Sequence, residues 1–274
     1  MREAPEIDKA SSFRPLAVVT GASRGIGAEY ARALAERGYN LLLVARDQAR
    51  LETVATTLSA QYAVDIELEL LDLSQPGAAQ RLYSAASARA PHTRLLINNA
   101  GFGLYGPFVT HPLSKVQEML RLHINTVVES IRLFLPSMVE ARTGAIINVA
   151  SVAGFFSLPY MAEYAATKTF LITFSEALAE EVRPFGVHIQ ACCPGYTATD
   201  FHRTAGVSCS YPLPAQCVQH VVAASLRALH TSRVCVPVGW QGRILRLVSR
   251  LMPSSLVSRM SHIVTRRRLA EASR

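Results

Sequence analysis

Tyr164 and Lys168 are the residues of this sequence whose types and spacing point most directly to chemistry. Side chains four residues apart lie on one face of a helix, so the phenol and the ammonium are expected to occupy the same space. A nearby cation favours the phenolate and lowers the pKa of the phenol, which makes it a general acid that works near neutral pH. The same pair also occurs on ordinary exposed helices, so its interpretation depends on the residues around it.

A glycine-rich segment, Thr-Gly-Ala-Ser-Arg-Gly-Ile-Gly at residues 20–27, follows a short apolar run and precedes a stretch of helical periodicity. Strand, glycine turn and helix form an arrangement that binds dinucleotides. Gly21 permits the tight turn, Gly25 lets the backbone approach a pyrophosphate, and Gly27 lets helix and strand pack closely. The first gap between the glycines is wider than in the common Gly-x-Gly-x-x-Gly motif. Without its flanking elements, such a loop would be only a turn.

These two motifs resemble those of the short-chain dehydrogenase/reductase family, in the branch with Thr-Gly-x-x-x-Gly-x-Gly and Tyr-x-x-x-Lys. The resemblance extends over roughly residues 14–237 and includes further motifs in the family's order. They are Asn98-Asn99-Ala100-Gly101, Asn125, Ser151, and Pro194-Gly195 with Thr199. Six motifs in this order and at this spacing argue against coincidence.

The resemblance implies hydride transfer between a nicotinamide and a carbonyl carbon, coupled to proton transfer. Tyr164 would protonate the developing alkoxide, and Lys168 would lower the tyrosine's pKa and hold the nicotinamide ribose. Ser151 would donate a hydrogen bond to the carbonyl oxygen. Asn125 would support a backbone and water arrangement that connects Lys168 to solvent; its structural alternative is a side chain that satisfies a kinked helix. No metal is expected, because the chemistry needs none and the eight histidines show no ligand spacing.

The cofactor expected from these motifs is NADP(H). An acidic residue usually ends the second strand of an NAD-binding fold, whereas this chain has Ala45 followed by Arg46. Arg46 and Arg24 of the glycine loop would place two guanidinium groups near a ribose 2′-phosphate. The alternative is that Arg46 is a solvated residue at a helix start, partly neutralised by Asp47.

The resemblance also assigns the remaining cofactor contacts. Asp72, with Leu73 beside it, resembles the family's adenine-contacting aspartate, although a helix cap is its structural alternative. Thr199 and the backbone after Pro194 would hold the nicotinamide carboxamide. The full set of expected cofactor-binding residues is Gly21, Ser23, Arg24, Gly25, Ile26, Gly27, Arg46, Asp72, Leu73, Asn99, Tyr164, Lys168, Pro194, Gly195, Thr197 and Thr199.

Strands and helices are predicted to alternate along the chain. Apolar runs predict strands near residues 16–20, 40–45, 66–71, 94–98, 145–150, 187–193 and 233–237. Helices are predicted near 25–37, 48–60, 76–88, 113–139, 159–182 and 214–229. This alternation indicates an α/β fold, a doubly wound parallel sheet (Rossmann fold) of about seven strands with helices on both sides. Ligands bind at the carboxyl ends of such strands, where Asn98, Ser151 and Pro194 fall.

The chain has 274 residues, half of them hydrophobic and 18% charged, and no proline- or glycine-rich stretch divides it. We expect one dinucleotide-binding and catalytic domain at 14–237, between a flexible leader at 1–13 and a basic amphipathic helical tail at 238–274. The leader is charged and lacks the apolar region of a secretory signal. Five cysteines without a Cys-x-x-Cys pair indicate reduced thiols. Together with the lack of an apolar run of about 18 residues, they favour a cytoplasmic protein.

The tail is the part least typical of the family. Between residues 243 and 274 it carries eight arginines and one glutamate, and so most of the chain's formal net charge of +8. One helical face is predicted to hold Arg243, Arg246 and Arg250 and the other face apolar residues, with the helix ending at Pro253. The preferred interpretation is that the apolar face covers the substrate cleft or a partner subunit, and peripheral contact with an anionic membrane is the alternative. Nucleic-acid binding is not expected, because the charge is confined to one tail without interleaved aromatics.

The substrate is expected to be a small-molecule carbonyl or alcohol, apolar or acyl-chain-like rather than small and charged. Its pocket would be lined by the loop from Asp200 to about Pro214 and by apolar residues between the serine and the tyrosine, namely Phe155, Phe156, Leu158 and Tyr160. Two classes of function remain open. One is an NADPH-dependent oxidoreductase that favours ketone or aldehyde reduction, and the other is a non-catalytic dinucleotide-binding sensor or assembly protein. The intact set of catalytic residues favours the enzyme.

A homodimer or homotetramer is expected, as is usual in the family. The long helices at 113–139 and 159–182 carry more apolar side chains than one face of a sheet can cover. Examples are Leu133, Leu135, Phe170, Phe174 and Leu178.

Overall fold

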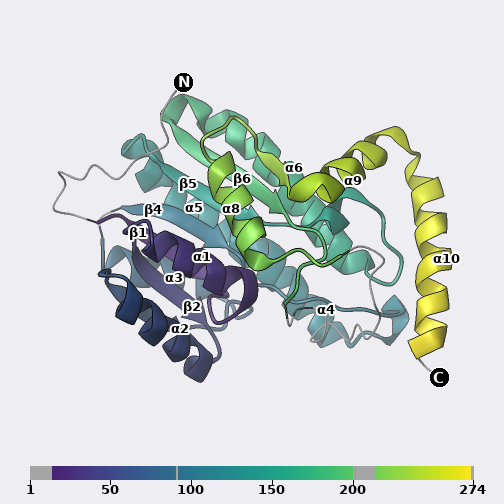
Figure 1. The fold of residues 1–274 in the computed structure, drawn as a ribbon, viewed down its shortest axis with the longest axis horizontal. Coiled ribbons are helices and arrows are strands. Elements are labelled where there is room, and N and C mark those ends of the chain that lie inside the picture. The colour runs from purple at the N-terminus through teal and green to yellow at the C-terminus, as the bar shows by residue number, and fades with distance from the viewer. Residues whose placement is uncertain (1–13, 91, 200, 202–213, 273–274) are drawn as a thin grey trace.

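The structure is a computed structural model that describes residues 14–90, 92–199, 201 and 214–272; the expected leader at 1–13 lies outside them. Its centre is one sheet of seven parallel strands in the order β3-β2-β1-β4-β5-β6-β7 (Figure 1). The predicted doubly wound sheet is confirmed, and its strand boundaries differ from the predicted ones by at most two residues. The strands are β1 (Leu16–Thr20), β2 (Asn40–Ala45), β3 (Ile66–Leu70), β4 (Thr93–Asn98), β5 (Gly144–Val149), β6 (Val187–Cys193) and β7 (Cys235–Pro237).

Successive residues of the central strands point to opposite faces of the sheet and enter two separate apolar cores. In β1, Leu16 and Val18 belong to the first core, whereas Ala17 and Val19 belong to the second. Strands buried on both faces explain why the sequence shows continuous apolar runs rather than alternation. The first core is closed by α3 (Ala78–Ser87), α5 (Thr126–Glu140) and α6 (Ala162–Val182), and the second by α1 (Gly25–Ala35), α2 (Gln48–Gln61) and α8 (Val218–Ala228).

The segment predicted as one helix at 113–139 consists of three parts. α4 (Leu113–Leu120) passes into a wider π-helical turn at Arg121–Asn125, and α5 continues from Thr126. A π turn inserts an extra residue into the helical repeat and so rotates the side chains around the helix axis. This rotation decides which side chains of the segment face α6.

The strand order reverses between β1 and β4. β2 and β3 lie on one side of this pair, and β5, β6 and β7 lie on the other. The loops that leave the carboxyl ends of β1 and β4 therefore diverge and open a crevice, which is where ligands bind in such sheets.

The tail forms two helices beyond the last strand. α9 (Gly239–Leu251) and α10 (Ser254–Ala272) are separated at Pro253 and lie on the side of the molecule remote from α2 (Figure 1). Arg246 departs from the expected solvated face, because its guanidinium donates to the carbonyl oxygen of Cys235 at 2.9 Å and to Glu176 at 2.8 Å. Within the described part of the chain, none of the helices combines the length and apolar character needed to cross a lipid bilayer.

The apolar side chains expected at a subunit interface pack largely within the chain. Leu178 is buried in the first core, and Leu133 and Leu135 are half-buried against it. Phe170 and Phe174 are also half-buried, and their rings stack with centroids 5.6 Å apart. The apolar excess on these helices is therefore smaller than the sequence suggested, and the oligomer stays a prediction.

Candidate active site

A large pocket opens at the carboxyl edge of the sheet and has a volume of about 900 Å³. Every expected catalytic and cofactor-binding residue except Gly27 and Asn125 lies on its wall. The glycine loop and the end of β2 form one end, whereas α6 and the loops after β5 and β6 form the other.

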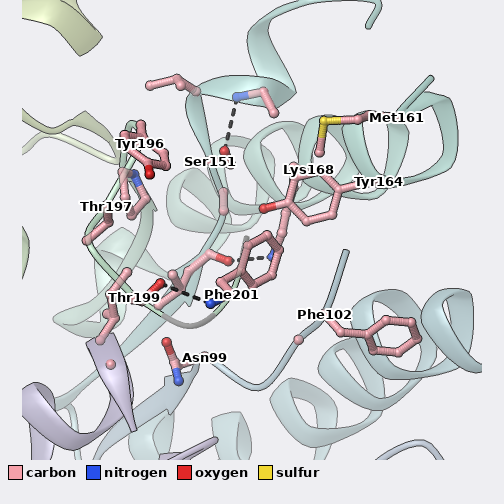
Figure 2. Close-up of a pocket in the computed structure, with 18 of the residues that line it drawn as sticks. Asn99, Phe102, Ser151, Met161, Tyr164, Lys168, Tyr196, Thr197, Thr199 and Phe201 are labelled. Carbon is pink, nitrogen blue, oxygen red and sulfur yellow. Dashed lines mark hydrogen bonds between the residues drawn. The ribbon is translucent and has the colours of Figure 1, made fainter. Parts of the chain in front are cut away.

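Tyr164 and Lys168 come from one face of α6, one turn apart, and both line the pocket (Figure 2). A buried polar ladder fixes α6 against the sheet below them. Asn98 Nδ2 donates to Asn148 Oδ1 at 2.9 Å, and Asn148 Nδ2 donates to Ser175 Oγ of α6 at 2.9 Å. The ladder joins β4, β5 and α6, so the position of the reactive pair is set by the sheet.

Lys168 is 5% exposed, and this burial lowers the pKa of its ammonium from 10.5 to about 8, against a smaller opposing effect of Cys193. Its Nζ donates a hydrogen bond to the carbonyl oxygen of Val149 at 2.8 Å and lies 5.6 Å from the centroid of the Tyr164 ring. The ammonium is therefore the dominant form at neutral pH, and its charge favours the phenolate of Tyr164.

Ser151 begins a short 3-10 helix at Val152–Phe155, just after β5. Its Oγ accepts a hydrogen bond from the Ala153 amide at 3.1 Å, so its own hydrogen is directed elsewhere and can be donated to a carbonyl oxygen in the pocket. The Val152 amide donates to the Pro194 carbonyl oxygen at 3.0 Å, which joins the loops after β5 and β6. Figure 2 shows Ser151 and the Tyr164 phenol bordering the same space.

The glycine loop brings bare backbone to the wall of the pocket. Gly21 and Gly25 have φ angles of +66° and +57°, which other residues rarely adopt. A Cβ at Gly27 would lie 2.1 Å from the carbonyl oxygen of Gly21, so only glycine lets α1 start so close to the loop. Arg24 precedes the first residue of α1 and also lines the pocket. This cradle fits a pyrophosphate at the helix N-terminus.

Thr20 joins the glycine loop to the loop after β4. Its Oγ1 accepts from the amides of Asn99 at 2.9 Å and Ala100 at 3.1 Å, and it donates to the Ile97 carbonyl oxygen at 3.0 Å. In return, Asn99 Nδ2 donates to the carbonyl oxygens of Thr20 at 2.9 Å and Gly21 at 3.2 Å. The two sides of the crevice are thus bonded to each other at its floor.

Arg46 lies on the pocket wall at the end of β2 and is 60% exposed. Its Nη1 is 3.3 Å from Glu118 Oε1 and 3.7 Å from Asp72 Oδ2. Asp47, the neighbour of Arg46 in the alternative interpretation, accepts from the Arg50 amide at 3.2 Å and pairs with the Arg50 guanidinium at the start of α2. Asp47 therefore belongs to the helix start, and other carboxylates hold Arg46.

Asp72 combines its expected place on the pocket wall with its structural alternative. Its carboxylate accepts from the amide and the hydroxyl of Ser74 at 3.0 and 2.7 Å, which caps the turn after β3. Burial alone would raise the pKa of Asp72, but the hydrogen bonds from Ser74 and Gln75 and the charge of Arg46 outweigh it and hold the pKa below its ordinary value. Asp72 is therefore ionised at neutral pH, with Leu73 beside it on the wall.

Gln216 organises the loop after β6, although no pattern in the sequence marks it. Its Oε1 accepts from the Gly195 amide at 3.2 Å, and its Nε2 donates to the Val238 carbonyl oxygen at 2.9 Å. Its backbone also bonds to Tyr196 and Ala198. Gln216 thus ties the expected nicotinamide clamp to the start of the tail, across a gap of 21 residues that no local pattern reveals.

The structure does not place Asn125 at the site. Asn125 is exposed at the end of the π turn and is absent from the pocket wall. His123 of the same turn is buried, and the expected role of Asn125 in connecting Lys168 to solvent stays a prediction.

His123 is the buried polar residue of the turn, 1% exposed, and its ring centroid lies 6.0 Å from that of Tyr164. Burial and the charge of Lys168 hold the pKa of His123 well below its ordinary value, so the ring is neutral. Its Nε2 accepts from the Phe102 amide at 3.2 Å, so Nδ1 carries the hydrogen and donates to Thr167 Oγ1 at 3.0 Å. Thr167 in turn donates to the Tyr164 carbonyl oxygen at 2.8 Å. A sequence signal existed, because His123 stands between two aliphatic residues in a helical stretch.

The substrate end of the pocket is apolar. Phe156 and Leu158 line it as expected, whereas Phe155 packs against the first core and Tyr160 stacks on His262 of α10, with ring centroids 5.5 Å apart. Most of the expected substrate loop at 200–214 lies outside the described residues. Of that loop Phe201 lines the pocket, and its ring centroid lies 5.6 Å from that of Tyr164. The tail supplies further apolar lining: Leu245, Val248 and Met252 from α9 and its end, and Val257 and Met260 from α10.

A glycine loop at the crevice of a parallel sheet, with serine, tyrosine and lysine at the same edge, defines a dinucleotide-binding α/β protein. The profile of the family described as short chain dehydrogenase matches residues 15–207. The chain therefore belongs to the short-chain dehydrogenase family.

Two relatives named very-long-chain 3-oxoacyl-CoA reductase are similar over most of this chain. The protein from Phaeosphaeria nodorum is 33% identical over 216 residues, which cover 76% of this chain and 63% of that protein. The protein from Anas platyrhynchos is 31% identical over 247 residues, which cover 88% of this chain and 77% of that protein. The chain thus spans less than two thirds of the length of the first of these relatives.

Solved structures of similar size match the fold more completely. A short-chain dehydrogenase from Sphingobium yanoikuyae in complex with NADPH is 32% identical, with a TM-score of 0.78 over 86% of this chain and 93% of that one. A bulky-bulky ketone specific alcohol dehydrogenase from Comamonas testosteroni is 30% identical, with a TM-score of 0.74 over 86% of this chain and 91% of that one.

Proposed function

We propose that this chain is an NADPH-dependent oxidoreductase that interconverts a carbonyl and an alcohol, with reduction of a ketone or aldehyde as the favoured direction. The observation that carries the proposal is the convergence of Ser151, Tyr164 and Lys168 at the apolar end of the same pocket that has the glycine loop and Arg46 at its other end. A protein that only sensed a dinucleotide would not need a buried lysine held beside a tyrosine in this pocket.

The residues of the pocket fit NADPH. The backbone of Gly21 and Gly25 would hold the pyrophosphate, and the guanidinium groups of Arg24 and Arg46 would hold the 2′-phosphate. When bound, NADPH supplies the hydride for the carbonyl carbon. The loop from Pro194 to Thr199 would position the nicotinamide, with Gln216 as its support.

The proton chemistry falls to residues of this chain. Tyr164 Oη donates its proton to the carbonyl oxygen as that oxygen becomes an alkoxide, which leaves a phenolate on the enzyme. The buried charge of Lys168 stabilises this phenolate, and Ser151 donates a hydrogen bond to the same oxygen. Solvent returns the proton to Tyr164 after the alcohol leaves.

The proposed substrate is apolar or acyl-chain-like. It would lie along a stretch of the pocket wall formed by uncharged side chains, namely Phe156, Leu158, Met161, Val248 and Met252. A 3-oxoacyl chain, the substrate type in the names of the two relatives, combines a ketone with a long apolar segment. These two parts suit the reactive and the apolar ends of the pocket.

We further propose that the protein acts in the cytoplasm as a homodimer or homotetramer, with peripheral contact of its tail to a membrane. Sedimentation at micromolar concentration tests the assembly, and a monomer there would overturn it.

The substitution Tyr164→Phe tests the proposed function. It removes the proton donor but keeps the ring and Lys168, so turnover should fall by a factor of about 10² to 10⁴ while NADPH still binds. The measurement is NADPH absorbance with ketones of increasing chain length, including a 3-oxoacyl thioester. Tyr160→Phe is the matched control, because it removes a phenol hydroxyl whose ring stacks on α10 and lies off the pocket wall. Comparable turnover in Tyr164→Phe and wild type would contradict the proposal.

A further inference from the structure

α9 carries apolar side chains on two adjacent faces. Leu245 and Val248 line the pocket, and Met252 at the end of the helix does the same. A second set lies outside: Trp240, Ile244, Leu247 and Leu251, which are 67%, 50%, 58% and 75% exposed. We call these four residues the outer stripe.

The spacing of the outer stripe places it on one face of α9. Its members are four, three and four residues apart, which is the repeat that aligns side chains along a helix. Single exposed apolar residues are ordinary, but four in a row on one helix mark a contact surface. The pocket-lining residues lie on one side of the stripe, and Arg243 and Arg250, both exposed, lie on the other.

α10 repeats this combination of apolar and basic residues. Leu256, Met260 and Ile263 are 47%, 54% and 54% exposed, and Arg259 and Arg266 are exposed between and beyond them. From Gly239 to Arg266 the sequence contains no aspartate or glutamate. The contact surface of the tail is therefore apolar and cationic.

We propose that the outer stripe docks on an anionic lipid surface and that the apolar substrate enters the pocket past α9 from that surface. The part concerning the substrate rests on the proposed function. A lipid surface offers both apolar chains for the stripe and anionic headgroups for Arg243 and Arg250. A second copy of this chain fits less well, because a symmetric contact along the stripe would bring like-charged arginines together without an acidic partner on either helix.

The route from the surface to the pocket follows from the same side chains. Met260 is both half exposed and part of the pocket wall, and Val248 of the pocket wall lies one turn after the exposed Ile244 on α9. Apolar side chains thus continue from the outer stripe into the substrate end. A long apolar molecule that follows them need not cross water, in which it is poorly soluble.

Vesicle binding of the full chain tests the docking. The probes are vesicles of phosphatidylcholine alone and vesicles that also contain phosphatidylserine, and the measurement is co-flotation at low and high salt. Wild type should bind the anionic vesicles more tightly than the neutral ones, and salt should weaken this binding. Two double variants should each weaken binding by about tenfold or more. One combines Leu247→Asn with Leu251→Asn, and the other combines Arg243→Glu with Arg250→Glu.

Matched controls carry the same chemical changes elsewhere. Phe185→Asn removes another exposed apolar side chain and Arg233→Glu reverses another exposed arginine, both just before strands β6 and β7 at the opposite edge of the sheet. These controls should bind vesicles like wild type. Thermal unfolding and NADPH binding of every variant confirm that the sheet remains folded.

Three outcomes would overturn the docking. In the first, wild type binds neither kind of vesicle. In the second, the stripe variants bind vesicles as tightly as wild type. In the third, wild type is a dimer that the stripe variants convert to a monomer without any change in vesicle binding. Activity separates this proposal from the proposed function, because the stripe variants should reduce a short water-soluble ketone at the wild-type rate. The stripe variants should lose activity only with a long-chain ketone presented in anionic vesicles, where their kcat/KM should fall by about tenfold. Equal kcat/KM in that assay would overturn the entry route alone.

Discussion

The cofactor side and the substrate side of the pocket are held in place by different means. On the cofactor side, here taken together with the reactive residues and called the rigid side, Thr20, Asn99 and Lys168 bond to backbone groups at the ends of neighbouring strands, at distances from 2.8 to 3.2 Å. On the substrate side, α9 and α10 contribute mostly apolar side chains, with Arg246 as a polar link to β7 and α6. Exposure differs accordingly, because Lys168 is 5% exposed and Met260 is 54% exposed.

This difference separates the chemistry from the choice of substrate. Groups that must meet a reacting atom within a fraction of an ångström are fixed by hydrogen bonds on the sheet. Groups that only exclude water and select a shape come from helices outside it, which open locally at a lower free energy than the core. Substrate range can therefore change through the tail without disturbance of the reactive residues.

Lys168→Met, on the rigid side, should have the largest effect on turnover. Below pH 8 the lysine is charged in both the folded and the unfolded chain, and its lowered folded pKa of about 8 against 10.5 destabilises the fold by about 3 kcal/mol. Removal of the lysine relieves this destabilisation, but it also removes the hydrogen bond to Val149, which reduces the gain in stability by about 1 kcal/mol. Without cofactor, the free energy of unfolding at pH 7 should thus be about 2 kcal/mol higher for the variant than for wild type. With NADPH present, the turnover of the variant should fall at least about 10²-fold.

The pH dependence provides the check. Between pH 8 and 10.5 the unfolded chain holds the lysine proton that the folded chain has released, so wild-type stability rises with pH in this window. The stability difference between variant and wild type, measured by urea unfolding, should therefore shrink from pH 7 to pH 10. A difference that stays constant over this range would show that Lys168 is not buried as described.

Arg24→Ala combined with Arg46→Ala tests the other end of the rigid side. Two exposed guanidinium groups contribute about 1 kcal/mol each to binding of a 2′-phosphate, so the preference for NADPH over NADH should fall by roughly 30-fold. The measurement is Kd for both cofactors by fluorescence. Arg81→Ala is the control, because Arg81 is an exposed arginine that pairs with Glu69 and lies off the pocket wall. A wild-type preference for NADH would reverse this prediction.

His123→Ala probes the link between the two sides of the crevice. It leaves the partly buried Phe102 amide without its acceptor, which costs about 1 kcal/mol of stability. It should also lower kcat about tenfold, because Thr167 and Tyr164 are displaced. His123→Gln keeps an acceptor for the Phe102 amide and should recover most of the stability. If His123 served only in packing, His123→Ala would lower the stability and leave kcat unchanged.

Leu245→Ala combined with Val248→Ala probes the substrate side and should have the smallest effect. Both residues line the pocket from α9, so KM for a long-chain ketone should rise by about threefold to tenfold, whereas the Kd of NADPH should not change. A short ketone is the control, because it does not reach α9. A loss of NADPH binding would show that the tail also holds the cofactor side together.

The sequence predicted what local patterns can encode. Apolar runs marked all seven strands, and the glycine loop and the Tyr-x-x-x-Lys pair marked residues that the structure brings to one pocket. The chain's own sterics explain Gly21, Gly25 and Gly27, because their positions require positive φ or the absence of a Cβ. Such requirements are visible in a sequence since they restrict single residues.

The sequence failed where the answer depends on register or on distant contacts. Periodicity predicted one continuous helix at 113–139, but a π turn interrupts it at Arg121–Asn125, where His123 is buried and Asn125 is exposed. The contacts of Gln216 and of Arg46 join segments that are far apart in the chain. The two-faced character of α9 was hidden as well, since hydrophobicity alone does not distinguish a pocket wall from an exposed stripe.

Thr20 also has a consequence for the order in which the molecule assembles. Its hydroxyl meets residues 77 to 80 positions later in the chain, because β1 pairs with β4 across the units formed by β2 and β3. The floor of the cofactor crevice therefore forms only after a long loop has closed, which is a late and slow event in folding. A cofactor bound there stabilises contacts made late, so NADPH should slow the unfolding of this protein without accelerating its refolding.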